Sequence, residues 1–576
     1  MPALVMALGQ PVWSRIDEAQ HADFIIQLSH GVYPAADMTV IDPETLKVMQ
    51  STGFFTGAQP GTYPVPDLTD LGTPPPGMTA TANAAWMSRH LWQLSFESAQ
   101  TPGYYLLMVP IWWLSDHAAG TFAAIYMLRV INALLIALLA PMAFAVARMI
   151  GPGRPGLAAT SVVFAILLPG LDLNGTRISN DGLSAAIGGL FVLLLVRWTG
   201  ASLTWRRVAA LGLLLGAGLL VKLTLAGLFP ALAAVALVPA PGAGWPRRLL
   251  RVAVAAGIAI ACLLPWFLIN LHLYGGLTPG ARGARLSDAV PAGFQILFVP
   301  FDLAVFGLTF WSGEPFGALP LAALFSVVGA LLALTAPIGV VRWLKTEAGS
   351  QHGRMLIAVT AGCGMAGVAL ILPAAGGFEF GAAGRYLYPA LPAVAALIAI
   401  GLHTVLARPP ARRLVTAFYS VSAAGIMAAY VAGIPALPSA GAGQPPVDVR
   451  IVPVAGTGSL DGVTIMVSRV ALDGGSKTTW FQVRATNSSP GEIEWSVVPV
   501  ASIGGQLAYG DYARSSQLPG DLDPGQSESG WLMVPFDPAQ LAPGEQIYLR
   551  FTSVAVNGYA TVKDVDLTVS IPAPLP

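Results

Sequence analysis

The sequence predicts a mostly α-helical, polytopic transmembrane bundle followed by an antiparallel β-sandwich, and three observations predict it. Of the 576 residues, 55% are hydrophobic and only 10% are charged, whereas soluble domains carry about 25% charged residues. Apolar segments of roughly spanning length recur between residues 122 and 434. From residue 447 onward the pattern changes to short alternating runs rich in β-branched and aromatic residues, which is typical of strands.

A membrane-spanning helix needs about 20 apolar residues, and about ten stretches approach that length. The expected spans are Phe122–Ile150, Leu157–Leu173, Gly182–Val196, Val208–Lys222, Leu223–Val238, Leu249–Leu271, Ala318–Val341, Met355–Pro373, Tyr386–Leu406 and Leu414–Ile434. The pair around Lys222 could instead be one broken re-entrant hairpin. The opening "MPALVMALGQPVWSRI" is too short to cross a bilayer, so we expect a first helix that is truncated or absent. It also lacks the cationic start and full apolar core of a secretory signal peptide.

The placement of lysine and arginine predicts the orientation of the spans. Alternate connections are short and basic, with Arg148/Arg154, Arg197/Arg206/Arg207, Arg247/Arg248/Arg251, Arg342/Lys345/Arg354 and Arg408/Arg412/Arg413. Such connections face the cytoplasm. The opposite connections, the long loop 35–120 and everything after residue 434 are then extracytoplasmic. Richness in alanine, glycine and arginine suggests a bacterial source, so the expected location is the bacterial cytoplasmic (inner) membrane.

Three regions follow from these patterns: a transmembrane domain over 1–438, a linker over 439–446 and a β-sandwich or jelly roll over 447–576. The linker reads "SAGAGQPP", and runs such as "TTWFQVRAT" and "QIYLRFTSVAV" are separated by Gly, Pro, Asn and Asp clusters. Within the sandwich, Trp480, Trp495 and Trp531 could stack on sugar rings. The favoured alternative is that these rings are core aromatics, as large aromatic residues in small sandwiches usually are. A short helix is expected near Pro43–Gln50.

Composition also excludes several classes of function. The formal net charge is zero, so no nucleic-acid partner is expected. The two cysteines, Cys262 and Cys363, lie in apolar runs and indicate neither a disulfide framework nor a thiolate metal site. No glycine-rich nucleotide-binding loop is evident.

The stretch "VWSRIDEAQHADFIIQLSHG" is the first candidate for chemistry, because it concentrates acid in a chain that is otherwise apolar. On a helix, Asp17 and His21 share one face, with Glu18 beside it. Asp17 could also be an N-cap with Gln20 as its capping-box partner. Two adjacent carboxylates and a histidine suit proton abstraction from a hydroxyl, or capture of a divalent cation.

Further polar residues are expected on the same side of the membrane. Glu97 lies in "ESAQTPGYY", and Asp181 opens a helix, where it could be merely an N-cap. Lys222 interrupts an apolar double segment, which favours a functional role, although its amine could snorkel to the interface. Arg385 in "GRYLYPALP" could grip a phosphate bidentately, or could anchor the interface with Tyr386.

The order and sidedness of these motifs resemble the integral-membrane glycosyltransferases of the C fold, the GT-C superfamily. The matching elements are the acidic pair with its trailing histidine, then "QTPGYY", "ISNDGL", "GLLVKLT", "LPWFLIN" and "GRYLYPALP". The resemblance covers about Arg15 to Leu406. It is greatest to a bacterial branch of uncharacterised polytopic membrane proteins, with protein mannosyltransferases and aminoarabinose transferases as more distant relatives. Family members have a complete helix before the acidic pair, so we expect either that the true start lies upstream of Met1 or that the chain begins with a half-helix.

The resemblance implies inverting transfer of a sugar from a polyprenyl-phosphate donor to a cell-envelope glycan or glycolipid acceptor on the extracytoplasmic side. It implies no cofactor with certainty, although a divalent metal could bind Asp17, Glu18 and His21. The roles that it implies are catalysis by Asp17, the base, and Glu18; acceptor orientation by His21, Glu97 and Asp181; and donor phosphate binding by Lys222, Arg385 and Tyr386.

Two other classes of function stay open. One is a lipid-linked glycan transporter or flippase, although no internal repeat of the kind common in transporters is visible. The other is a non-catalytic envelope assembly protein whose sandwich binds a glycan.

Overall fold

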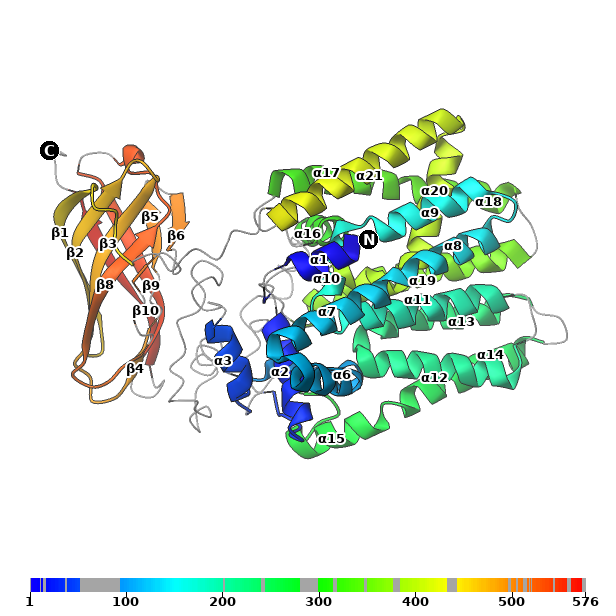
Figure 1. Ribbon diagram of the computed structural model, residues 1–576, viewed down its shortest axis with the longest axis horizontal. Helices are drawn as coiled ribbons and strands as arrows, with labels where there is room; N and C mark the ends of the chain where they lie inside the picture. Colours follow the sequence, from blue (N-terminus) through cyan, green and yellow to red (C-terminus); the bar gives the residue numbers. More distant parts are fainter. Residues whose placement is uncertain are drawn as a thin grey trace. The chain divides into compact units, whose positions relative to one another are not determined.

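The computed structural model divides into two units (Figure 1). The helical unit comprises Met1–Ala35, Glu97–Gly280 and Arg285–Ile434, and the sandwich unit comprises Ala36–Phe96, Ala281–Ala284 and Pro435–Pro576. The structure describes residues 2–10, 12–13, 17–36, 39–51, 94–199, 203–239, 244–279, 299–313, 319–346, 350–376, 384–432, 443–495, 499–503, 506–510, 515–516, 518, 521–541, 544–556 and 561–571. Half of the expected linker 439–446, residues 439–442, lies outside these residues.

Within the described residues, the helical unit is built from α-helices and short 3₁₀ helices. Its elements are α1 (Pro2–Gly9), α2 (Glu18–Ser29), η2 (Phe96–Ala99), α6 (Gly103–Ala119), α7 (Thr121–Ala137), α8 (Leu139–Ile150), α9 (Pro155–Ile166), α10 (Pro169–Thr176), α11 (Asp181–Trp198), α12 (Trp205–Val221), η3 (Leu223–Leu228), α13 (Phe229–Leu237), α14 (Trp245–Ala261), α15 (Leu264–Tyr274), α16 (Val299–Trp311), α17 (Leu319–Ala333), α18 (Thr335–Thr346), α19 (Ser350–Gly376), η6 (Gly384–Ala390), α20 (Leu391–Val405) and α21 (Pro409–Ala432).

Among the described residues, five helical segments are long and apolar enough to cross a membrane, and seven if each bent pair counts as one span. These findings confirm the expected transmembrane bundle. Two expected spans are bent: Leu157–Leu173 breaks between α9 and α10 by 49°, and Leu249–Leu271 breaks between α14 and α15 by 42°. Pro169 and Pro265 lie in the first turns after the breaks. Proline has no N–H to donate to the preceding turn and disfavours helical backbone before it.

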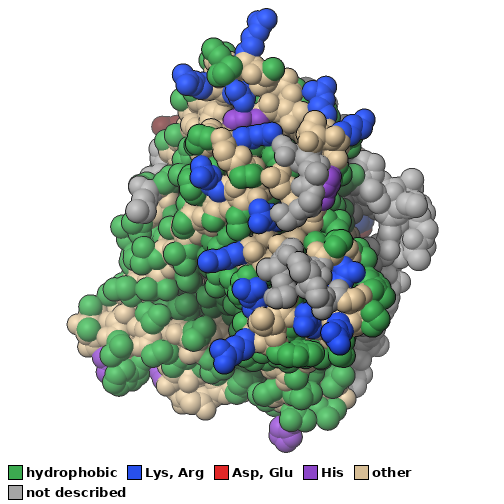
Figure 2. All heavy atoms as spheres, turned by 90° about the vertical axis from the view of Figure 1, so that its right-hand side faces the viewer, with side chains coloured by type: hydrophobic (Ala, Val, Ile, Leu, Met, Phe, Trp, Pro, Cys, Tyr) green, Lys and Arg blue, Asp and Glu red, His purple; other side chains and the backbone are tan. Residues whose placement is uncertain are grey.

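Lysine and arginine side chains gather on one end of the helical unit (Figure 2). The sequence explains this end, because α8 and α11 carry Arg148 and Arg197 in their last turns, and α12 begins next to Arg206 and Arg207. This arrangement is the one that the positive-inside rule produces. We refer to this face as the basic end.

Helix α11 lies at the centre of the bundle, where it contacts α7, α8, α12, α19, α20 and η6. A side chain is excluded at Gly188, because a Cβ there would lie 2.4 Å from Cβ of Pro389. Glycine therefore lets η6 approach α11 closely. The 18 residues of α11 extend about 27 Å at about 1.5 Å per residue. Asp181 at the start of α11 is consequently far from Arg197 and from the basic end.

The sandwich unit contains two antiparallel sheets. Its elements are α3 (Pro43–Ser51), η7 (Pro538–Gln540), β1 (Arg450–Leu460), β2 (Val463–Asp473), β3 (Thr478–Asn487), β4 (Ile493–Glu494), β5 (Val500–Ile503), β6 (Gln506–Tyr509), β7 (Asp521–Leu522), β8 (Ser527–Val534), β9 (Gln546–Val556) and β10 (Thr561–Ser570). One sheet has the order β1-β2-β3-β8, and the other the order β6-β5-β9-β4-β7 with β10 paired to β9. Alternate residues of both sheets, such as Val483 and Leu549, form one buried core. The expected antiparallel sandwich and the short helix at Pro43 are confirmed.

Candidate active site

A polar cavity of about 180 Å³ lies in the helical unit. Five stretches of chain that are distant in sequence supply its walls. The lining residues are Asp17, His21, Glu97, Gln100, Arg177, Ser179, Asn180, Asp181, Lys222, Thr224, Arg385 and Tyr386. The cavity therefore brings together seven of the eight residues expected in the active site, and the exception is Glu18.

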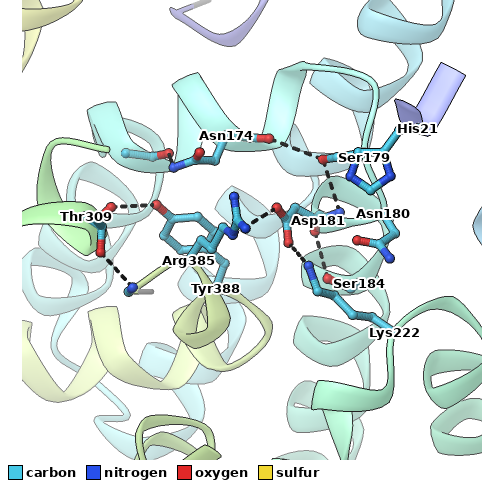
Figure 3. A network of polar contacts seen from close by, with 12 residues as sticks. His21, Asn174, Ser179, Asn180, Asp181, Ser184, Lys222, Thr309, Arg385 and Tyr388 are labelled. Atoms are coloured by element: carbon cyan, nitrogen blue, oxygen red, sulfur yellow. Dashed lines mark hydrogen bonds and ion pairs between the residues drawn. The ribbon is translucent and has the colours of Figure 1, made fainter. Parts of the chain in front are cut away.

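The cationic wall of the cavity is organised around Asp181 (Figure 3). Nζ of Lys222 forms an ion pair with Oδ1 of Asp181, and Nε of Arg385 lies 3.9 Å from Oδ2 of the same carboxylate. The ring of Tyr386 contacts both cations, with its centroid 5.2 Å from Nζ of Lys222 and 5.8 Å from Cζ of Arg385. One carboxylate and one aromatic ring thus hold two positive charges side by side.

Two helix ends bring Asp181 and Lys222 together. Asp181 is in the first turn of α11, where a carboxylate interacts favourably with the helix dipole. Lys222 directly follows α12, and its backbone is extended, with φ −158° and ψ 120°. Because the chain leaves the helix there, the lysine side chain turns into the cavity, whereas a helical continuation would direct it along the flank of α12.

Contacts to α16 fix the position of Arg385. The Gly384 N–H donates to Oγ1 of Thr309 at 2.7 Å, and the Tyr388 hydroxyl lies 3.4 Å from the carbonyl oxygens of Thr309 and Phe310. A Cβ at Gly384 would lie 2.3 Å from the carbonyl oxygen of Phe306. Glycine is therefore required for this close approach, which sets the direction in which Arg385 leaves the backbone.

The acidic wall begins at Asp17, the residue before α2. Its backbone is left-handed, with φ 52°, and its side chain does not cap the helix, so the expected capping box is not formed. Aspartate tolerates this conformation better than most residues, and such strain is concentrated at functional sites. The Asp17 carbonyl still accepts a hydrogen bond from the His21 N–H at 2.9 Å. Asp17 and His21 consequently both line the cavity.

His21 and Glu97 form a buried pair beside Asp17. Nδ1 of His21 is hydrogen-bonded to the Tyr105 hydroxyl at 2.8 Å and lies 3.4 Å from Oε2 of Glu97. Burial, followed by the charge of Lys222, holds the pKa of His21 well below its usual value of 6.5. Burial, followed by the charge of Asp17, raises the pKa of Glu97 to about 8. At neutral pH the histidine is therefore uncharged and the glutamic acid is protonated.

The raised pKa of Glu97 links folding to pH. In the unfolded chain this carboxyl ionises near 4.5, whereas in the folded protein it keeps its proton up to about pH 8. The folded state thus binds more protons between these values, and stability falls as pH rises through this window. His21 acts in the opposite direction below pH 6.5, because the unfolded state there binds the additional proton. Between pH 6.5 and 8 the effect of Glu97 is the one that operates.

The structure corrects the expectation for Glu18. Its carboxylate is fully buried and accepts two hydrogen bonds from Arg129, from Nε at 2.7 Å and from Nη2 at 2.6 Å. A third comes from the Ile178 N–H, at 2.9 Å. Glu18 does not line the cavity. Adjacent helical residues point about 100° apart, so Asp17 can face the cavity while Glu18 faces the bundle.

This placement also bears on the expected metal site. Among the residues that the structure describes, no three His, Cys, Asp or Glu side chains are grouped so that they could hold a metal ion. Glu18 binds Arg129 and is therefore not directed toward a point shared with Asp17 and His21. Asp17, Glu18 and His21 therefore do not form a site that fits a divalent cation.

Sequence reasoning missed five lining residues. Arg177 and Ser179 belong to the "RISND" run before α11, and Gln100, Asn180 and Thr224 supply neutral polar groups. The amide of Asn180 donates to Oε1 of Gln100 at 3.5 Å and to the Val221 carbonyl at 3.3 Å. A charged residue four positions before Asp181 was the available signal for Arg177. Gln100 and Thr224 had no signal beyond their proximity to Glu97 and Lys222.

The three tryptophans of the sandwich unit lie in different settings. Trp495 is fully buried against Phe551, with ring centroids 5.7 Å apart. Trp480 is 7% exposed, and its Nε1 donates to Oγ1 of Thr478 at 3.1 Å. Trp531 is partly buried and packs against the small cluster that Trp480 forms with Ala471 and Met533. Trp495 and Trp480 match the core alternative for these rings.

Fold and cavity together define a multi-pass membrane protein with a polar cavity lined by charged side chains, away from the basic end of its bundle. No protein-family model matches the chain, and no curated protein sequence matches it. Among solved structures, it is similar to the oligosaccharyltransferase of Archaeoglobus fulgidus, with 18% identity over 58% of this chain and a TM-score of 0.29. It is also similar to the arabinosyltransferase EmbB of Mycobacterium smegmatis, with 13% identity over 97% of this chain and a TM-score of 0.25.

The chain spans 46% of the length of the oligosaccharyltransferase and 64% of that of the arabinosyltransferase. At such TM-scores the likeness is too distant to bear on activity. The case for a function therefore depends on the geometry of the cavity.

Proposed function

We propose that the protein is a membrane glycosyltransferase that moves a sugar from a polyprenyl-phosphate donor to a hydroxyl of a cell-envelope glycan or glycolipid. One observation carries the proposal: a single cavity, far along α11 from the basic end, is lined both by the carboxylate of Asp17 and by the cations Lys222, Arg385 and Arg177. By the positive-inside rule the reaction is extracytoplasmic, in a bacterial cytoplasmic membrane.

The chemistry needs both walls. Asp17, as general base, accepts the proton of the acceptor hydroxyl while the hydroxyl oxygen attacks the anomeric carbon. The bond between that carbon and the phosphate oxygen breaks with inversion, and the bonding electrons stay on the phosphate. Lys222, Arg385 and Arg177 stabilise the resulting charge on the phosphate. The proton is then on Asp17, and the polyprenyl phosphate departs as the leaving group.

Neutral groups complete the proposed site. Protonated Glu97 and uncharged His21 are adjacent to Asp17. Both can hydrogen-bond to an acceptor hydroxyl without competing with Asp17 for its proton. Asp181 is ion-paired with Lys222 and near Arg385, which keeps both cations oriented before the donor binds. Tyr386 presents its ring to the same two cations.

The test is sugar transfer by the full-length protein in membrane vesicles, from a synthetic polyprenyl-phosphate sugar to an envelope glycan fraction. Asp17→Asn is expected to lower kcat by about 10²–10⁴-fold and to leave the KM of the donor within about threefold. Asp116→Asn, an acid of α6 that bonds Thr121 and does not line the cavity, is the matched control. Unchanged transfer by Asp17→Asn would exclude the proposed base.

A further inference from the structure

Arg129 is a fully buried charge that does not line the cavity. It belongs to α7, within the membrane-spanning segment Thr121–Ile150, and its side chain is fully buried. A buried cation in a membrane is costly unless its hydrogen bonds are satisfied. Its guanidinium donates two bonds to Glu18, and Nη1 donates a third to the Gln10 carbonyl at 2.9 Å.

These bonds join four segments of the chain. Gln10 follows α1, Glu18 begins α2, Arg129 is in α7, and Ile178, which also donates to Glu18, lies between α10 and α11. Neither Arg129 nor Glu18 lines the cavity. Their neighbours do: Asp17 directly precedes Glu18, and Arg177 and Ser179 flank Ile178.

We propose that Arg129 and Glu18 are a positioning pair that sets the spacing between the base Asp17 and the segment Arg177–Asp181 of the cationic wall. This inference rests on the proposed function. The two parallel bonds of an arginine–carboxylate pair fix both distance and angle. Oε1 of Glu18 accepts from both the Arg129 side chain and the Ile178 N–H, so the same oxygen links α2, α7 and the backbone before α11.

The left-handed backbone of Asp17 supports this role. A non-glycine residue stays at φ 52° only when surrounding contacts determine its conformation. The next residue, Glu18, supplies those contacts, with three hydrogen bonds to its carboxylate. A displacement of about 1 Å between reacting groups can lower a rate by about 10²-fold, so a pair that never touches substrate can still control kcat.

The experiment compares Arg129→Lys and Glu18→Gln with the matched control Arg354→Lys in the full-length protein in nanodiscs. Lysine keeps the charge at position 129 but cannot form the bidentate pair, whereas glutamine keeps an oxygen that accepts from Ile178. Arg354 donates to the Met149 carbonyl at 2.8 Å and does not line the cavity. Two quantities are measured: the kinetics of sugar transfer, and backbone hydrogen exchange over residues 17–22 and 177–181.

Arg129→Lys is expected to lower kcat by about 10²-fold, to leave both KM values within about threefold, and to speed exchange in both segments. Glu18→Gln is expected to change kcat and exchange in the same direction but by less, and Arg354→Lys is expected to match the wild type in both. If Arg129→Lys does not fold, Glu18→Gln carries the test by the same readouts. Exchange identical to wild type in both segments, or an unchanged kcat, overturns the inference. Absence of transfer by the wild-type protein would refute the proposed function instead, and exchange would still test the positioning pair.

Discussion

Replacement of Lys222 by methionine separates its contribution to stability from its contribution to catalysis. The side chain is 7% exposed and forms an ion pair with Asp181. Lys222→Met leaves the Asp181 carboxylate buried, and breaking a buried pair on one side costs about 3–5 kcal/mol. Arg385 remains 3.9 Å from that carboxylate and compensates in part. We therefore expect the lower end of the range, about 3 kcal/mol, or roughly 150-fold in the unfolding equilibrium.

The double variant Lys222→Met/Asp181→Asn removes both charges. Replacing both partners of a buried interaction is nearly neutral, so its stability should return to within about 1 kcal/mol of wild type. Transfer should not return, because the leaving phosphate still lacks one cation, a loss of about 10²–10³-fold in kcat.

The assay is the midpoint of thermal unfolding in detergent together with initial rates of transfer, for wild type and both variants. The reasoning predicts that the single variant is the least stable, while both variants are equally inactive. Recovery of more than about a tenth of wild-type kcat by the double variant would show that Lys222 acts only through Asp181. An unchanged midpoint for Lys222→Met would show that the pair contributes nothing to stability.

Three other predictions concern separate parts of the chain. Glu97→Gln should flatten the decline in thermal stability between pH 6.5 and 8. In the wild type the folded state keeps the Glu97 proton up to a pKa of about 8 while the unfolded state has released it, and the glutamine amide does not titrate. Gly384→Ala should lower kcat by about tenfold or more. The added Cβ would lie 2.3 Å from the Phe306 carbonyl oxygen and would displace Arg385. Trp495→Ala should destabilise the sandwich by about 3–5 kcal/mol, seen as faster proteolysis within 447–571.

Each of these has its control in the same chain. Glu528→Gln removes an acid of β8 that does not line the cavity, and should keep the wild-type pH profile. Gly425→Ala, whose Cβ would meet nothing within 4 Å, should leave transfer unchanged. Trp531→Ala, at a partly buried ring, should be cleaved less than Trp495→Ala. Equal effects of a variant and its control would refute the corresponding structural reason.

The spacing of apolar residues and the placement of lysine and arginine were sufficient to predict the fold class. Long apolar runs can satisfy their backbone in lipid only as helices, so α7, α11 and α20 were accessible from the sequence. The bend between α9 and α10 was also accessible, since Pro169 stands at the break. It was not predicted because apolar length alone does not distinguish a straight span from a broken one.

The site was predictable in its residue types but not in all its pairings. Asp17 and Glu18 are adjacent acids, and no local pattern indicates which of them faces the cavity. The answer depends on Arg129, which is 111 residues from Glu18 in sequence. Similarly, Arg177 contributes to the site only because the chain before α11 brings it to the same cavity as Lys222. Such long-range complementarity becomes visible only when the helices are packed.

The scattering of the cavity over five stretches of chain has a consequence for biogenesis. Asp181 and Lys222 are only 41 residues apart, so the hairpin α11–α12 can enter the membrane with its opposite charges already matched. Arg385 is synthesised roughly 370 residues after Asp17, or about 20–70 s later at typical translation rates. In the nascent chain, Asp181 and Lys222 can therefore pair long before the site is complete. The proposed site is complete only when Arg385 arrives, just before one of the last helices to be inserted.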